Sequence, residues 1–176
     1  TINIYDANVL LADAAVGEEV VIRAENNSWV PGDRNRETLY IPAGKTLHIV
    51  GGSLNANDGT WANDITGTGT LIVDRQYTTT TGANITYTVS ARDLTISADS
   101  GSNTTTNIGK NVTVSNNMVV ASSSSYSNTV NINGDTTVNV GNNLSKNSSG
   151  DQANSIVKIN NTATLIVNEQ ANSDIT

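Results

Sequence analysis

The sequence contains no cysteine and no phenylalanine, and methionine and proline are scarce. Without cysteine the chain can form neither a disulfide framework nor a thiolate metal site. It also lacks any run of 18 apolar residues, so no insertion into a membrane is expected. Only 9 residues are Lys or Arg and the net charge is −7, which argues against nucleic acid as a partner, because such binding neutralises phosphates with clustered basic residues.

The apolar residues are mostly Ile and Val, whose branched Cβ atoms fit a pleated strand better than a helix. One short phrase, two apolar residues separated by a single residue, recurs along the chain. Its copies begin at Val20, Leu47, Leu71, Leu94, Val112, Val138 and Leu165. Successive copies are 18 to 27 residues apart, which is a spacing typical of repeat proteins.

Each repeat divides into three strand-like pieces. Residues 129–132 exemplify the first, the recurring phrase is the second, and residues 118–120 exemplify the third. Gly51-Gly52 and Asn116-Asn117 precede third pieces. We expect these pairs to form sharp corners between strands, because Gly and Asn reach left-handed backbone conformations at least cost.

The alternation within each phrase predicts how the repeats pack. Leu47 and Ile49 alternate with Thr46 and His48, so one side of this strand should be buried and the other solvated. Parallel stacking would place the inward residues about 4.8 Å apart in a continuous ladder. The expected ladder is Leu47, Leu71, Leu94, Val112, Val138 and Leu165.

The sequence therefore predicts an all-β fold, a right-handed parallel β-helix (β-solenoid) of about six to seven coils. Crossovers between parallel strands are nearly always right-handed, which sets the expected hand. Residues 1–16 have the one helix-like composition and are expected to cap the first coil, which leaves residues 17–176 as a single solenoid domain.

The variable repeat length, the Gly-x-x-Φ-x-Φ phrase (Φ, apolar) and the abundance of Asn, Ser and Thr resemble the secreted β-helices of bacterial surface adhesins. The autotransporter passenger and filamentous-haemagglutinin-like group is the nearest match, over roughly residues 17 to 170, and phage tailspikes are a looser one. The resemblance implies an extracellular or cell-surface rod that serves reach, adhesion or self-association. Adhesin passengers are usually far longer, so it also implies a fragment or a repeating subunit.

No catalytic residue is predicted. Some parallel β-helices cleave polysaccharides with clustered carboxylates, which must lie close together on one outer face. Asp74, Asp93 and Asp135 instead occupy different positions of the repeat. His48 is the only histidine and should point outward, so it can form neither a triad nor a multi-histidine metal site.

Five residues are candidates for carbohydrate binding: Trp29, Trp61, Asp58, Asp64 and Tyr126. Asp58 and Asp64 flank Trp61 in the best local cluster of acidic and aromatic residues, although a solvated loop whose Trp covers the coil edge is the preferred explanation of this cluster. No cofactor or metal ligand set is predicted. Calcium is the remaining option, held by turn oxygens near Asp58, Asp64 or Asp99.

Two further patterns are weighed and left aside. A register of outward threonines would suggest ice binding, but Thr137 and Thr78 are predicted to be out of register with Thr46 and Thr95. Seven Asn-x-Ser/Thr triplets leave glycosylation open, because a chain rich in these residues forms such matches by chance. They begin at Asn26, Asn84, Asn103, Asn111, Asn143, Asn147 and Asn160.

The final repeat, residues 156–167, is as apolar as the internal ones, and residues 168–176 are too few to cap it. An exposed strand edge invites another chain, so self-association, head-to-tail or lateral, is expected, unless the chain is cut within a longer rod. The function expected from the sequence is a non-enzymatic extracellular structural or adhesive protein that contacts itself and surface glycans. The alternatives are a tailspike-like module that binds or depolymerises polysaccharide and, less favoured, an amyloid-like matrix subunit.

Overall fold

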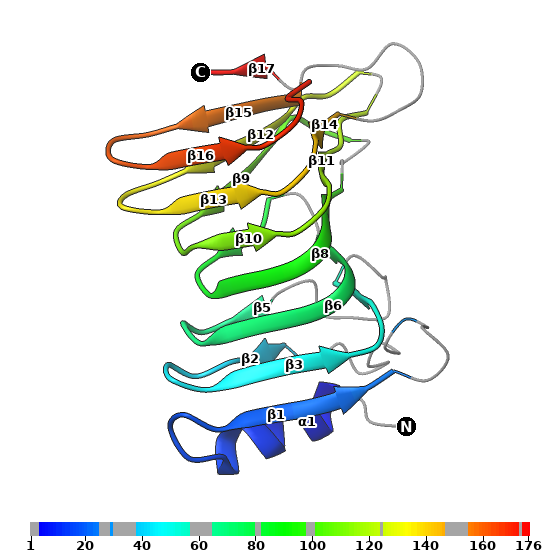
Figure 1. Cartoon of the computed structure of the whole chain (residues 1–176), viewed down its shortest axis with the longest axis vertical. Helices are drawn as coiled ribbons and strands as arrows, with labels where there is room; N and C mark the ends of the chain where they lie inside the picture. The colour runs from blue at the N-terminus through cyan, green and yellow to red at the C-terminus, as the bar shows by residue number, and fades with distance from the viewer. Residues whose placement is uncertain are drawn as a thin grey trace.

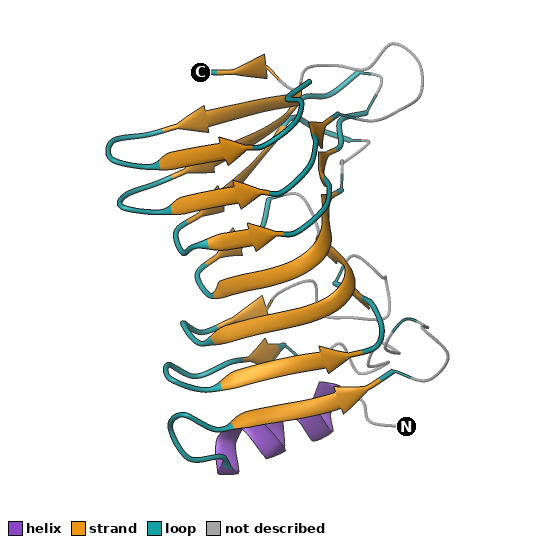
Figure 2. Ribbon diagram, viewed as in Figure 1, coloured by secondary structure: helices purple, strands orange, loops and turns teal. Residues whose placement is uncertain are grey.

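Parallel strands wound about one axis form the part of the chain that the computed structural model describes, residues 4–24, 29, 38–56, 65–79, 82–97, 101–123, 125–146, 155–172 and 174–176. The strands follow one another as a right-handed β-solenoid of about five turns (Figure 1). The predicted fold class is confirmed. Figure 2 shows that strands and short connections make up all of it except one helix, which lies across the N-terminal end.

The largest sheet has ten strands, seven of which lie one above another along the axis. These seven are β1 (Glu19–Arg23), β3 (Thr46–Val50), β6 (Thr70–Thr79), β8 (Thr88–Ile96), β10 (Val112–Val114), β13 (Thr137–Val140) and β16 (Thr164–Val167). The outward surface of these seven strands is called the long face below. Strands β6 and β8 continue around a corner, where their register shifts between Val73 and Gln76.

Beyond this corner, three shorter strands form a second face. They are β4 (Leu54–Asn55), β11 (Met118–Val120) and β14 (Leu144–Ser145). Strand β4 pairs with the end of β6, β11 with the end of β8, and β14 with β11. A third face closes each coil and contains two further sheets. Its strands are β2 (Leu39–Tyr40) with β5 (Ile65–Thr66), and then β7 (Asn84–Ile85), β9 (Thr104–Ile108), β12 (Asn128–Ile132), β15 (Ser155–Ile159) and β17 (Asp174–Ile175).

The core is one continuous stack of aliphatic side chains enclosed by the three faces. In β3, Leu47 and Ile49 are buried while the residues between them are half-exposed. Parallel pairing places Leu47, Leu71 and Val89 in register, and each is at most 1% exposed. Two tyrosines also enter this core, where the hydroxyl groups of Tyr77 and Tyr87 lie 2.7 Å apart.

Helix α1 (Ile4–Asp13) covers the first coil at the N-terminal end. Ala7 and Leu11, one turn apart on the same side of α1, are fully buried. Lys45 Nζ donates to the backbone carbonyl oxygens of Leu11 at 2.8 Å and Ala12 at 3.1 Å, which satisfies acceptors that the last turn of a helix leaves open. The N-terminal capping segment is thus a helix held by both apolar and polar contacts.

The number of coils is lower than predicted. The seven strands of the long face correspond to the seven repeats counted in the sequence, and the strands of the third face are divided between a sheet of two and a sheet of five. The solenoid completes about five turns rather than six to seven.

The predicted inward ladder is wrong at Leu94. The residue above Leu71 is Val89, whereas Leu94 pairs with Tyr77 on one side and Met118 on the other. Strand β8 is nine residues long and bends around the corner, so Val89 and Leu94 belong to two different faces.

The predicted reason for the Asn-Asn corners is also wrong. Gly51 does have a positive φ of 75°, but Asn161 is the only non-glycine residue with positive φ among the described residues. Asn116 and Asn117 therefore turn the corner without left-handed backbone. Their side chains instead hydrogen-bond to the neighbouring coil.

Candidate functional site

Three of the five residues predicted to bind carbohydrate, Trp61, Asp58 and Asp64, lie outside the described residues, as does Asp99 of the possible calcium site. The two that are described do not come together. Trp29 is 48% exposed and bridges to Ser53 at the first coil of the stack. Tyr126 is half-buried, and its N–H donates to Ser123 Oγ at 3.0 Å. Four strand spacings, about 19 Å, separate the two aromatic residues along the axis.

No group of three His, Cys, Asp or Glu side chains suited to a metal ion occurs among the described residues. Across the same part of the chain, no helix has the length and apolar character needed to cross a membrane.

One cluster of ionisable side chains does lie on the long face, and the sequence analysis missed it. His48 on β3 lies between Glu19 on β1 and Asp74 on β6. Its Nδ1 contacts Glu19 Oε1, and its Nε2 lies 2.6 Å from Asp74 Oδ1. The backbone N–H of Gly51 donates to the other oxygen of Asp74 at 2.9 Å. His48 points outward, as predicted, and forms a polar bridge across three successive coils.

The two carboxylates favour the protonated imidazole. Partial burial of the ring opposes its charge, but the hydrogen bonds and negative charges of Asp74 and Glu19 outweigh this and raise the pKa of His48 above 6.5. The hydrogen bond with His48 is in turn the main cause that lowers the pKa of Asp74, with a smaller contribution from the Gly51 N–H. Because both ring nitrogens are engaged, this cluster joins coils rather than activates a nucleophile.

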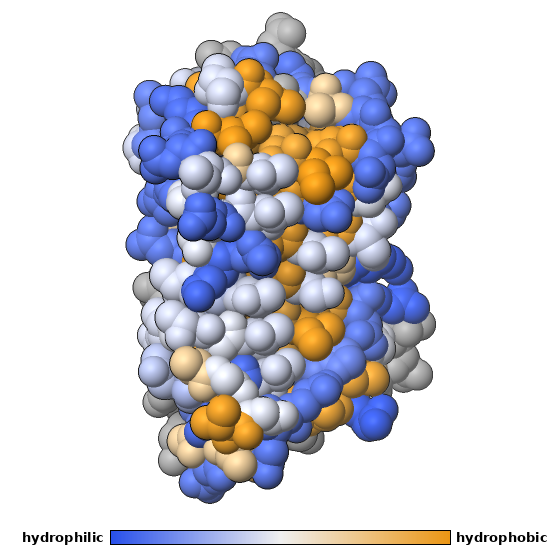
Figure 3. All heavy atoms as spheres, turned by 60° about the vertical axis from the view of Figure 1, so that its left-hand side comes forward, coloured by the Kyte–Doolittle hydropathy of each residue, from blue (hydrophilic) through white to orange (hydrophobic). Residues whose placement is uncertain are grey.

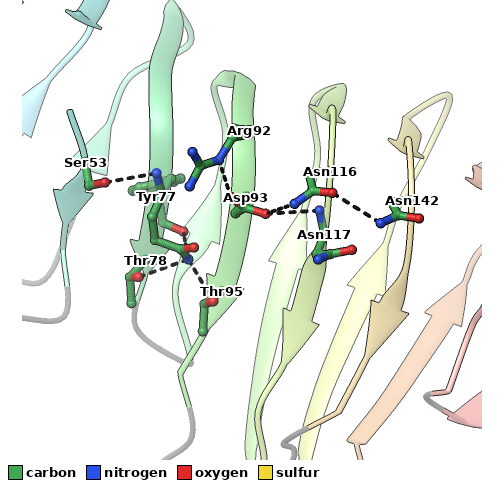
Figure 4. A network of polar contacts seen from close by, with 10 residues as sticks. Ser53, Tyr77, Thr78, Arg92, Asp93, Thr95, Asn116, Asn117 and Asn142 are labelled. Atoms are coloured by element: carbon green, nitrogen blue, oxygen red, sulfur yellow. Dashed lines mark hydrogen bonds and ion pairs between the residues drawn. The ribbon is translucent and has the colours of Figure 1, made fainter. Parts of the chain in front are cut away.

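A second polar array runs along the corner between the long face and the second face. Asp93 accepts from Asn116 Nδ2 at 2.9 Å and from the N–H of Asn117 at 3.2 Å. The array continues upward, where Asn142 Nδ2 donates to Asn116 Oδ1 at 3.2 Å (Figure 4). The N–H of Asn143 likewise donates to Asn117 Oδ1 at 3.1 Å. Such side-chain ladders lock the register of successive coils.

The long face itself is weakly polar. Two of its outward rows contain a single carboxylate, Glu19, and no Lys or Arg, whereas a third row along one edge contains the charged residues Arg23, Asp74 and Arg92. The first row is Glu19, Thr46, Thr70, Thr88, Asn111, Thr137 and Thr164, and the second is Val21, His48, Ile72, Ser90, Thr113, Asn139 and Ile166. Figure 3 shows a strip of pale and hydrophobic residues along the long axis, with hydrophilic residues on both sides of it.

The predicted misregister of threonines is therefore wrong. Thr46, Thr70 and Thr88 are direct neighbours, and Thr137 continues the same row. Thr78 also pairs with Thr95 on the second face. Parallel stacking in register produces both the threonine row of the long face and the Thr78–Thr95 pair of the second face. The prediction missed them because it placed Leu94 on the wrong face. A row of small hydroxyl side chains does not by itself define a ligand.

The two ends of the described solenoid differ. At the N-terminal end, Val20 and Ile22 of β1 are 8% and 4% exposed beneath α1. At the other end, Leu165 and Val167 of β16 pack on the core but remain half-exposed. Strand β17 pairs with β15 and so covers part of the third face only. Figure 3 shows hydrophobic residues gathered near this end.

Comparisons with known proteins give no match: no family model, no curated protein and no solved structure is similar to this chain.

Proposed function

We propose that this chain is a non-enzymatic structural or adhesive β-solenoid of the cell surface or extracellular space, and that it associates with copies of itself. The observation that carries the proposal is the long face. Seven strands in register hold two adjacent outward rows that contain no Lys or Arg, beside an edge row that contains Arg23, Asp74 and Arg92. Such a surface is suited to broad contact rather than to chemistry at one point.

The rigidity of the fold supports a scaffolding role. Every internal inward residue of the ladder is buried, and backbone hydrogen bonds link each coil to the next. Polar ladders such as that of Asn116 and Asn142 add side-chain bonds between coils. A surface presented on this framework loses little conformational freedom when it binds, which favours association.

Two surfaces can carry self-association. The long face supports lateral contact between solenoids, and its Val21 and Ile166 are 38% and 40% exposed. The half-exposed Leu165 and Val167 of β16 support contact at the end of the stack. In the adhesive role these contacts would be made with a second copy or with surface glycans.

Light scattering coupled to gel filtration over a range of concentrations tests the proposal. Ser90→Lys places a charge in the middle of the long face, where like charges would oppose lateral contact between copies. Thr105→Lys is the matched control, since Thr105 is also exposed and central but lies on the third face. We expect concentration-dependent oligomers that Ser90→Lys weakens and Thr105→Lys leaves unchanged. A chain that stays monomeric at every concentration would remove self-association from the proposed function.

A further inference from the structure

A recess opens on the side of the solenoid where the third face turns into the long face. Three residues, 109–111, lie between Ile108 and Val112, whereas five, 133–137, lie between the residues paired with them in the next coil, Ile132 and Val138. Three residues, 86–88, also separate the equivalent Ile85 and Val89 on the other side. In Figure 1 the β12–β13 turn extends further from the axis than the β7–β8 and β9–β10 turns. The longer turn therefore overhangs a notch left by the two shorter ones.

The recess has a volume of about 380 Å³, at the lower end of the range for small-molecule sites. Its polar lining consists of Thr88, Lys110, Asn111, Asn133, Asp135 and Thr136. Gly109 and Gly134 complete the wall and leave backbone groups accessible, because they have no side chain. The space suits one sugar-sized ring rather than a macromolecule.

Thr136 is the feature that points to a ligand. It lines the recess and is only 5% exposed, yet its hydroxyl forms no hydrogen bond with any residue that the structure describes. A buried hydroxyl without a protein partner must form its hydrogen bond with whatever occupies the recess, water or a ligand. A hydroxyl group of a ligand in the recess would restore the missing hydrogen bond.

The walls are held in place before any ligand arrives. Asn111 Oδ1 accepts from the N–H of Thr137 at 2.9 Å, which fixes its amide at the edge of the recess. Asn133 Oδ1 accepts from Asn160 Nδ2 at 3.0 Å in the next coil. Polar groups that are positioned in advance lose little freedom on binding.

The charge and composition of the lining indicate the class of ligand. Lys110 and Asp135 carry opposite charges, so the recess has no net charge to select an anion or a cation. The remaining groups are amides and hydroxyls, which both donate and accept hydrogen bonds. No aromatic ring lines the recess, so binding must depend on hydrogen bonds rather than on stacking.

We infer that this recess binds a neutral, hydroxyl-rich ring, a single monosaccharide unit, with Thr136 as a central contact. The inference deepens the proposed function and rests on it, since a glycan unit of a surface is what an adhesive solenoid would hold. Without ring stacking, the affinity for a free monosaccharide is expected in the millimolar range.

Nuclear magnetic resonance titration of the complete chain tests the inference, with glucose, galactose, mannose and N-acetylglucosamine as separate probes. We expect at least one sugar to cause saturable shifts in the amide signals of residues 109–111 and 133–136. Thr136→Val keeps the shape of the side chain but removes the hydroxyl, and should weaken binding about three- to tenfold, the effect of one hydrogen bond. Without sugar, Thr136→Val should melt at the same or a higher temperature, since an unpaired hydroxyl has been replaced by a methyl group.

Thr137→Val is the matched control, because Thr137 is the next residue and lies in the outward row of the long face. It should leave the affinity unchanged. The inference is overturned if none of the four sugars causes saturable shifts, or if Thr136→Val binds as tightly as the natural chain. If the chain binds sugar but does not self-associate, only the proposed self-association is wrong. If it self-associates but binds no sugar, only the proposed sugar site in the recess is wrong.

Discussion

At the scale of single residues, the contact that His48 makes between coils should depend on pH, because its strength depends on the protonation of the imidazole. Its raised pKa means that its ionic bridge stabilises the fold fully below pH 6.5 and loses this contribution as the pH rises through the raised folded-state pKa. Asp74, whose pKa is lowered, contributes above its ordinary value of 3.8 and loses its contribution as the pH falls below that. The bridge should therefore be strongest between these limits.

We expect the difference in melting temperature between the natural chain and His48→Asn to be larger at pH 5.5 than at pH 8.5. Half-exposed ion pairs contribute about 1 kcal/mol or less, so the shift should be a few degrees. Thermal unfolding followed by circular dichroism at both pH values measures it. Equal differences at the two pH values would mean that the bridge contributes nothing through its charge.

The buried hydroxyl pair in the core gives a second prediction. Tyr77 is fully buried, burial raises its pKa to about 12, and its hydroxyl lies 2.7 Å from that of Tyr87. Tyr87→Phe should destabilise the fold by about 1–3 kcal/mol, because it removes a buried hydrogen-bond partner. Tyr77→Phe combined with Tyr87→Phe should cost less than the sum of the single changes, since the two residues are directly coupled. Urea unfolding of all three variants tests this, and strict additivity would contradict the direct coupling.

At the scale of elements, the corners limit which residues the coils accept. A Cβ atom added to Gly141, just after β13, would lie 2.3 Å from the carbonyl oxygen of Ser115 in the coil beneath. Gly141→Ala should therefore force the two coils apart and cost about 1–3 kcal/mol. Gly109→Ala is the control, because its nearest neighbour would be the Ile85 carbonyl oxygen at 3.8 Å, and it should change stability by less than about 1 kcal/mol. Chemical denaturation of both variants would show the difference, and equal effects would contradict it.

The strands were largely predictable from sequence because each inward pair repeats with strand periodicity. The pairing of β8 was not. Val89-Ser90-Ala91 is the copy that stacks on β6 of the long face, but Ala91 is a small residue and the phrase is weak. Leu94-Thr95-Ile96 is a stronger phrase and was chosen instead, although it belongs to the second face. When one bent strand contains two inward phrases, hydrophobicity alone does not show which of them belongs to the long face.

The contacts between coils were less predictable than the strands. His48 meets Asp74 and Glu19, which are 26 and 29 residues away, and each pairing depends on the length of the turn between them. The cluster could have been found by aligning the coils in their observed register and comparing outward residues on neighbouring strands that are offset by two positions. The recess near Thr136 was harder to predict, since it arises because the chain between the paired positions is two residues shorter at 109–111 than at 133–137.

At the scale of the whole molecule, a solenoid is close to one-dimensional, because each coil contacts only its neighbours. Its stability therefore varies along the axis and depends on how each end is covered. Helix α1 buries Ala7 and Leu11 against the first coil, whereas the inward side chains of β16 remain half-exposed. The two ends should consequently open with different free energies.

Hydrogen exchange read out by mass spectrometry can measure this difference. We expect the hydrogen-bonded amides of β16 to exchange at least about tenfold faster than those of β10 in the middle, with β1 between the two, because local opening is easiest where the fewest apolar side chains are buried. Leu11→Ala removes a fully buried contact of α1 and should speed exchange in β1 while leaving β16 unchanged, since the two strands lie at opposite ends of the stack. Faster exchange in β1 than in β16 of the natural chain would show that α1 does not protect its end. Equal acceleration of both strands by Leu11→Ala would show instead that the coils open as one cooperative unit.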